Sequence, residues 1–138
     1  MRRRGPKIIL AALIACLPLS LLAKKPWKTL NDPTLADAPA KARSLENPYA
    51  GKPEAVQAGK KLYARHCASC HGEEARGRDK APSLRSSVVG AAAPGALFWF
   101  LKNGSLKKGM PAWSRLPDQQ IWQLVSYLQT LREHPDSP

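Results

Sequence analysis

The sequence is poor in cysteine, which excludes the disulfide framework of a small secreted mini-protein. It holds three cysteines in 138 residues, at positions 16, 67 and 70. Removal of Cys16 with an N-terminal signal would leave only Cys67 and Cys70. This pair has to be explained by its own motif rather than by a network of cross-links.

Acidic residues are also scarce, with 10 Asp and Glu against 22 Lys and Arg and a formal net charge of +12. Four of the cations lie within the first seven residues, so a mature chain starting at Lys24 would keep 18 basic residues and a charge of +8. Excess basic charge favours acidic protein partners or an anionic surface, and it indicates nucleic acid only when binding motifs accompany it. The sequence has no such motif, so we expect no nucleic-acid partner.

The apolar run at the N-terminus is short for a membrane span. Its sixteen residues, from Ile8 to Ala23, follow a basic start and are interrupted by Pro18 and Ser20. A helix of that length would reach about 24 Å, less than the roughly 30 Å of a bilayer core. We therefore predict that residues 1–23 are an export signal cleaved after Ala23, which would place the mature protein in the periplasm.

Two other interpretations of this segment stay open. Leu13-Ile14-Ala15-Cys16 resembles the lipobox at which bacterial lipoproteins are cut and acylated on cysteine, although the apolar run continues past Cys16 to Ala23. The third interpretation is an uncleaved N-terminal anchor. Either of these two would associate the protein with a membrane, and finding Cys16 in the mature protein by mass spectrometry would contradict the simple signal.

Strand patterns are missing from the rest of the chain, and no internal repeat is visible. Helical spacing instead predicts helices over 53–66 and 94–102 and from 117 to about 134, the last with one apolar stripe. A glycine inside a helix lowers its stability, so the presence of Gly59 in the first of these helices needs a reason. A close approach of the last helix at this position would supply one. We predict an all-α domain over residues 51–134.

Residues 24–50 contain four prolines and few large apolar side chains, with no sustained helical or alternating period. This composition is typical of an extended linker. An arm packed over the domain through Trp27, Leu30 or Tyr49 is the alternative.

The run Cys67-Ala68-Ser69-Cys70-His71 is the most specific pattern in the chain. C-x-x-C-H is the attachment signature of c-type haem, in which each thiol adds to one vinyl group and the histidine ligates iron. A zinc site would need a second ligand pair, and His66 and His134 lack the spacing for one. A thioredoxin-like pair would open a helix in a βαβ unit, whereas this pair follows a helix. We predict one haem c bonded to Cys67 and Cys70, with His71 on the iron.

With this motif the chain resembles the bacterial class I cytochromes c, which are small monohaem electron carriers, and the similar domains attached to oxidases and dehydrogenases. The resemblance covers about Gly51 to Leu131 and implies three to four helices packed around one covalently bound haem c. It also implies that Gly59 and Tyr63 meet Leu124 and Tyr127 where the first and last helices cross. The matching segments are G-K-K-L-Y-A-R-H-C-A-S-C-H-G at 59–72, A-P-S-L at 81–84, L-K-N-G at 101–104, G-M-P-A-W at 109–113 and I-W-Q-L-V-S-Y-L at 121–128.

Met110 is the sole methionine after the initiator and lies between Gly109 and Pro111. Glycine permits a close backbone approach there, and proline stiffens the exit. A His/Met pair of axial ligands raises the reduction potential of haem iron, and the resemblance points to Met110 as the sixth ligand. Filling a gap in the core is the alternative role.

The resemblance also places the Pro82 carbonyl against the His71 imidazole, where a hydrogen bond would fix the tautomer and increase ligand basicity. Further candidates for the wall around the porphyrin, for which a general core role is equally open, are Leu84, Phe98, Leu101 and Trp113. His66 is expected to be a solvated helix residue.

If both axial positions are filled, no substrate can reach the iron, so the sequence predicts a single-electron carrier and not an enzyme. Its partners would be periplasmic or membrane redox proteins, such as a dehydrogenase or a terminal oxidase. One alternative is an enzyme or gas sensor with Met110 displaced; another is a fixed subunit of such a complex, tethered by residues 24–50. Cations near the predicted haem edge would dock an acidic partner, unless they are scattered solubilising charges: Arg76, Arg78, Lys80, Arg85, Lys102, Lys107 and Lys108.

Overall fold

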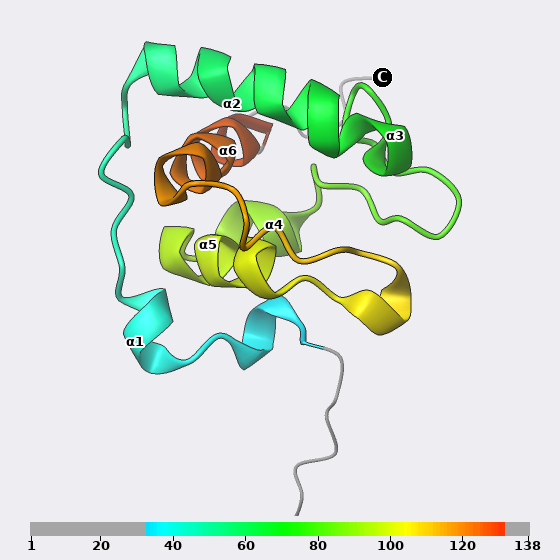
Figure 1. Cartoon of the computed structure of the whole chain (residues 1–138), viewed down its shortest axis with the longest axis horizontal. Coiled ribbons are helices and arrows are strands. Elements are labelled where there is room, and N and C mark those ends of the chain that lie inside the picture. Colours follow the sequence, from blue (N-terminus) through cyan, green and yellow to red (C-terminus); the bar gives the residue numbers. More distant parts are fainter. Residues whose placement is uncertain (1–32, 132–138) are drawn as a thin grey trace, which may run out of the picture.

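The computed structural model describes residues 33–131, and within that range the protein is built of helices without strands. This confirms the predicted all-α class. Three long helices dominate, and short helical turns connect them (Figure 1). In chain order the elements are η1 (Leu35–Asp37), α1 (Ala40–Arg43), α2 (Pro53–His66), α3 (Ala68–His71), α4 (Ser87–Ala91), α5 (Pro94–Asn103), η2 (Leu106–Lys108) and α6 (Asp118–Thr130).

The ends of the long helices are set by residues whose backbone preferences are visible in the sequence. Pro53 occupies the first turn of α2, where its missing N–H costs nothing. Helix α5 runs one residue further than predicted, because it stops only at Gly104, whose φ of +66° is costly for other residues. Helix α6 begins after Pro117, as predicted. It ends at Thr130 with Leu131 as its C-cap, and so stops before the predicted end near His134, a residue outside the described range.

Helices α2 and α6 cross at Gly59, as the cost of glycine in a helix suggested. A Cβ atom at position 59 would lie 2.0 Å from the Gln123 carbonyl oxygen and 2.9 Å from the Tyr127 Cβ. Next to the crossing, the rings of Tyr63 and Tyr127 pack with their centroids 5.3 Å apart. The crossing packs α2, the helix that leads into Cys67, against the buried face of α6. On that face Leu124 is 1% exposed.

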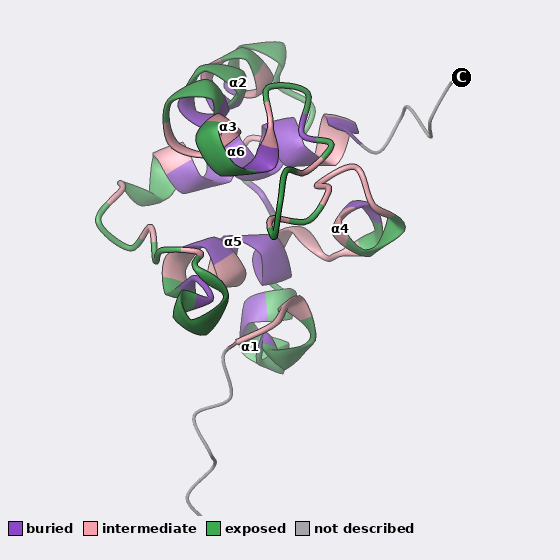
Figure 2. Ribbon diagram, turned by 90° about the vertical axis from the view of Figure 1, so that its right-hand side faces the viewer, coloured by how far each residue is buried: buried purple, intermediate pink, exposed green. Residues whose placement is uncertain are grey.

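The core lies between α6 and the helices that pack against it, and Figure 2 shows that much of the α6 ribbon is buried. On α5, Leu97, Phe98 and Leu101 are buried against α6. The Phe98 ring stacks on Trp122 at 4.2 Å between centroids and 19° between planes. Phe98 and Leu101, expected either at the porphyrin wall or in the general core, both belong to this core cluster.

The segment before α2 differs from the extended linker expected over residues 24–50. Over residues 33–50 the chain folds into η1 and α1 and packs on α5, so closely that a Cβ atom at Gly95 would lie 1.9 Å from the Ala42 carbonyl oxygen. The buried Asn47 amide donates hydrogen bonds to the Trp122 carbonyl (3.2 Å) and the Ser126 hydroxyl (2.9 Å). The packed-arm alternative therefore describes residues 33–50.

The contacts of this arm include two buried alanines, Ala38 and Ala42, the Asn47 amide and the partly buried Leu35, and they produce no hydrophobic period in the sequence. Tyr49 is partly buried against the core, as that alternative expected, whereas Trp27 and Leu30 lie outside the described residues. The predicted signal segment 1–23, with Cys16, lies outside them too. Within residues 33–131, no helix combines the length and apolar character that crossing a bilayer requires.

Candidate functional site

The five residues of the C-x-x-C-H run form one compact turn at the end of α2. Helix α2 ends at His66, and α3 starts immediately afterwards with the His71 amide donating to the Cys67 carbonyl at 2.9 Å. The Cys70 amide donates to the same carbonyl at 3.1 Å. This turn carries both sulfur atoms and the imidazole on four backbone steps, and neither cysteine is in a disulfide.

The His71 side chain is buried and held by one hydrogen bond. Its Nδ1 lies 2.9 Å from the Pro82 carbonyl oxygen, which is the contact that the family resemblance implied. A carbonyl oxygen only accepts, so Nδ1 carries the proton and donates it. In the neutral imidazole the other ring nitrogen, Nε2, then has a free lone pair that can bind a metal ion.

A tight loop brings Pro82 to this position. The Gly77 amide donates to the His71 carbonyl at 2.9 Å, and Gly77 has a φ of +87°. A Cβ atom there would lie 2.9 Å from the Pro82 carbonyl carbon, so glycine is required for the loop to close. Further along, the Leu84 amide donates to the Ala75 carbonyl at 2.9 Å, which ties the loop down beyond Pro82.

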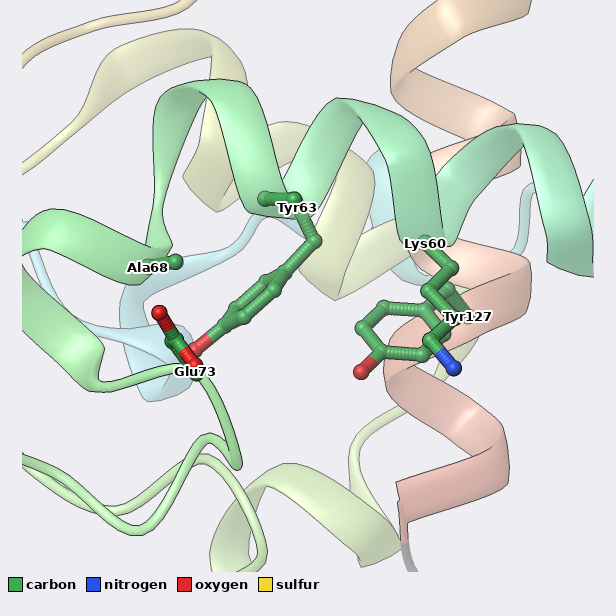
Figure 3. Close-up of a pocket in the computed structure, with 6 residues that line it drawn as sticks. Lys60, Tyr63, Ala68, Glu73 and Tyr127 are labelled. Atoms are coloured by element: carbon green, nitrogen blue, oxygen red, sulfur yellow. The ribbon is translucent and has the colours of Figure 1, made fainter.

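Tyr63 connects the helix crossing to the same turn. Its hydroxyl donates to the carbonyl of Gly72, the residue after His71. Burial, and next the nearby Cys67 and Tyr127, raise the pKa of Tyr63 to about 12, so the phenol stays protonated and able to donate at neutral pH. A pocket of about 360 Å³ opens beside this bond (Figure 3) and is lined by Lys60, Tyr63, Ala64, Ala68, Glu73 and Tyr127.

The two sulfur atoms have different surroundings. Cys70 is exposed, whereas Cys67 is partly buried. Burial, and next the neighbouring Cys70, raise the pKa of the Cys67 thiol to about 11. Catalytic redox pairs instead carry a thiol of lowered pKa. The raised pKa and the absence of strands in the described part of the chain both argue against the thioredoxin-like interpretation.

Met110 sits in a hydrogen-bonded loop between α5 and α6. The loop is closed by two bonds, from the Ser105 amide to the Met110 carbonyl (2.9 Å) and from the Met110 amide to the Ser105 carbonyl (3.0 Å). Gly109, in the left-handed conformation with a φ of +86°, makes the turn before it. The Met110 side chain is partly buried against the core. It is therefore kept near the apolar interior.

These donors fit a flat, apolar, iron-bearing group. The described residues offer no cluster of three His, Cys, Asp or Glu for a bare metal ion, so they do not support the zinc interpretation. They offer two free thiols, an imidazole with Nε2 available and a thioether. The apolar side chains left only partly buried against the core, which such a group could cover, include Leu84, Val89, Ala92, Met110 and Trp113.

His66 does not behave as the solvated helix residue that the sequence suggested. It is partly buried, and its ring packs on Trp113 with 5.1 Å between centroids and 55° between planes. The sequence offered no signal for this pair, because nothing local marks a contact between residues so far apart in the chain.

At least three of the seven cations expected to dock a partner are already engaged within the protein. Lys102 forms an ion pair with Asp118 at 2.6 Å, and Arg76 pairs with Glu74 at 3.0 Å. The Arg85 guanidinium donates to the Glu74 carbonyl at 2.7 Å and is partly buried. Also exposed are Arg78, Lys80, Lys107 and Lys108.

The chain matches one family of proteins and several individual known proteins. Residues 54–128 match the family described as "Cytochrome C oxidase, cbb3-type, subunit III". The chain is 35% identical over 106 residues to quinohemoprotein alcohol dehydrogenase ADH IIB of Pseudomonas putida, covering 75% of this chain and 15% of that protein. It is 35% identical over 91 residues to cytochrome c550 of Pseudomonas aeruginosa, covering 61% of each.

A third relative is the cbb3-type cytochrome c oxidase subunit FixP of Rhizobium meliloti, 36% identical over 84 residues, which are 58% of this chain and 29% of that subunit. The chain thus spans less than two thirds of each of these relatives. Among solved structures, cytochrome CL of Methylophaga aminisulfidivorans superposes with a TM-score of 0.53 at 26% identity, covering 62% of this chain and 58% of that one.

Proposed function

This chain belongs to the bacterial class I cytochrome c family, and we propose that it is a haem-based electron-transfer protein rather than an enzyme. It would carry single electrons on one haem c held by four of its own side chains. Cys67 and Cys70 would bond the porphyrin as thioethers, and His71 and Met110 would ligate the iron. When bound, haem c supplies a metal centre that takes up and releases one electron.

The observation that carries this proposal is the hydrogen bond from His71 Nδ1 to the Pro82 carbonyl. It leaves Nε2 as the ligand atom and fixes the ring on the turn that also holds both sulfur atoms. A bond of this type increases the basicity of a ligating imidazole. The apolar side chains of Leu84 and Trp113 would exclude water next to the group.

Met110 decides between a carrier and a catalyst. If its thioether occupies the sixth position, no substrate or gas can reach the iron, and only electrons pass. The short Ser105–Met110 bridge supports this role, because it restricts where the side chain can move. With Met110 displaced, the iron would be five-coordinate and open to an enzymatic or sensing role.

The test is to produce the full chain in a host competent for haem maturation. We expect a coloured protein with the added mass of one haem that resists acid extraction, and a weak near-infrared methionine-to-iron band in the oxidised form. Met110→Ala should abolish the band, while the control Leu106→Ala, an exposed residue of the same loop (71%), should keep it. A haem-loaded wild type without the band would contradict Met110 ligation, and a colourless wild type would contradict the whole proposal.

The redox partners would be a dehydrogenase or a terminal oxidase, because relatives of this chain include an alcohol dehydrogenase and an oxidase subunit. Docking would use the exposed cations Arg78, Lys80, Lys107 and Lys108 against an acidic surface. We place the mature protein in the periplasm after cleavage of residues 1–23, with acylation at Cys16 or an uncleaved anchor as the membrane-bound alternatives.

A further inference from the structure

The two axial ligands proposed above are carried by separate segments of the chain. His71 belongs to the turn that continues α2, and Met110 belongs to the loop between α5 and α6. Electron transfer without loss of the methionine requires that these segments keep their relative position. The side chains that join them are therefore of functional interest.

The His66–Trp113 ring pair makes such a connection. His66 is the last residue of α2 and directly precedes Cys67, and its ring centroid is 5.1 Å from that of Trp113. Among the described residues, no hydrogen bond or ion pair involves the His66 side chain, so the ring contact accounts for its position. A tilted aromatic contact of this kind is attractive in addition to the area it buries.

Trp113 is itself fixed to the methionine loop. Its amide donates to the Leu101 carbonyl near the end of α5 at 2.9 Å. Just before it, the backbone of Pro111 and Ala112 packs closely against Gly104, where a Cβ atom would lie 2.6 Å from the Ala112 nitrogen. Together with the Ser105–Met110 bridge, these contacts fix the position of Trp113 relative to the loop. A force on the indole is thus transmitted to Met110.

We propose that His66 is a positioning residue that holds the Met110 loop against the haem-attachment segment and thereby keeps the methionine on the iron. This inference rests on the proposed function. It predicts that removing the ring leaves haem attachment intact, because the C-x-x-C-H turn is closed by its own backbone bonds. Loss of the methionine should then become easier, since one of the contacts opposing it is gone.

The experiment measures imidazole binding to the oxidised holoprotein, since imidazole competes with Met110 for the iron. His66→Ala and His66→Gln both remove the ring, and Gln keeps length and polarity in case Ala matures poorly. We expect each to bind imidazole roughly two- to tenfold more tightly than wild type, the range given by an aromatic pair of ordinary strength. The reduction potential should fall in parallel, because a weakened iron–thioether bond favours the ferric form.

Two further variants make the test specific. His66→Phe keeps a ring at this position and should restore wild-type imidazole affinity. Arg65→Ala changes the exposed neighbour on the same helix and should also leave it unchanged. Wild-type affinity and potential in both ring-less variants would overturn the inference while leaving the proposed function intact, whereas a wild type without the near-infrared band would overturn the proposed function first.

Discussion

The phenol of Tyr63 and the imidazole of His71 are each fixed by one backbone carbonyl. Tyr63 donates to Gly72, and His71 donates to Pro82, so two hydrogen bonds help to define the position of the attachment turn. Because both acceptors are main-chain atoms, their placement depends on the fold of the loop and not on the identity of another side chain. A change at either donor is therefore easier to interpret than a change at the acceptor.

Tyr63→Phe should lower the stability of the holoprotein by about 1 kcal/mol at pH 8, because the Gly72 carbonyl loses its donor. The pKa of Tyr63 is raised from 10.0 to about 12, since burial penalises the charged form. The greater stability of wild type relative to the variant is thus fully present below pH 10 and is lost as the pH rises through about 12. Denaturant unfolding of both proteins at several pH values measures this difference.

Tyr49→Phe serves as the control, because no hydrogen bond of its hydroxyl lies within the described residues. Its stability at pH 8 should match wild type. An advantage of wild type over Tyr63→Phe that grows between pH 10 and 12 would contradict the assignment of the proton to the Tyr63 hydroxyl.

Among the elements, the crossing of α2 and α6 admits the least change. At Gly59 a methyl group would overlap the Gln123 carbonyl oxygen, which cannot move without bending α6. We expect Gly59→Ala to destabilise the holoprotein by roughly 3 kcal/mol, the upper end of the cost of overpacking. This loss would exceed the gain in helix propensity of about 1 kcal/mol. Thermal unfolding followed by circular dichroism measures it.

The control is Gln57→Ala, which also introduces an alanine into α2 but at an exposed position. It should change the stability of the holoprotein very little. If Gly59→Ala were as stable as this control, the close approach of the two helices would be wrong.

The arm formed by η1 and α1 is connected to α6 by one buried amide. Asn47→Ala would remove the donors to the Trp122 carbonyl and the Ser126 hydroxyl, and we expect a loss of about 1–3 kcal/mol. Because the amide lies between α1 and α2, the loss should appear first as faster proteolysis within residues 33–50. Limited proteolysis with mass spectrometry measures this, and Glu46→Ala, an exposed neighbour, should leave the cleavage rate unchanged.

For the molecule as a whole, the haem would serve as a large part of the core. The predicted cytochrome domain comprises only about 80 residues. At this size the burial of apolar side chains alone gives marginal stability, and a disulfide, metal or other cross-link is usually needed. We expect the double variant Cys67→Ser/Cys70→Ser, expressed under the same maturation conditions, to be largely unfolded by circular dichroism. A well-folded apoprotein with native helix content would contradict this.

The charge of the whole molecule should govern its encounters. Ten acidic residues against 22 basic ones leave a net charge of +12, or +8 if residues 1–23 are removed. Rates of electron transfer with an acidic redox protein should therefore fall as ionic strength rises, since salt screens the attraction. Stopped-flow measurements across a salt series test this.

Lys108→Glu should reduce the low-salt rate more than Lys41→Glu, because Lys41 lies on α1 outside the predicted docking set. Rates independent of salt for both proteins would leave the cations with a solubilising role only.

The sequence by itself determined the features that depend on residues close together in the chain. The start of α2 at Pro53, the stop of α5 at Gly104 and the attachment turn are set by local backbone preferences and spacing. The resemblance added the contact of Pro82 with His71. Gly59 was found because its cost in a helix has to be compensated, and helix packing is the usual compensation.

Tertiary structure alone decided how residues 33–50 pack, that His66 meets Trp113, and which cations are already paired, such as Lys102 with Asp118. The physical reason is the same in each case. These contacts join residues that are distant in sequence through one amide, one ring pair or one ion pair, and such single contacts leave no periodic trace in the chain. They arise only after the helices have packed.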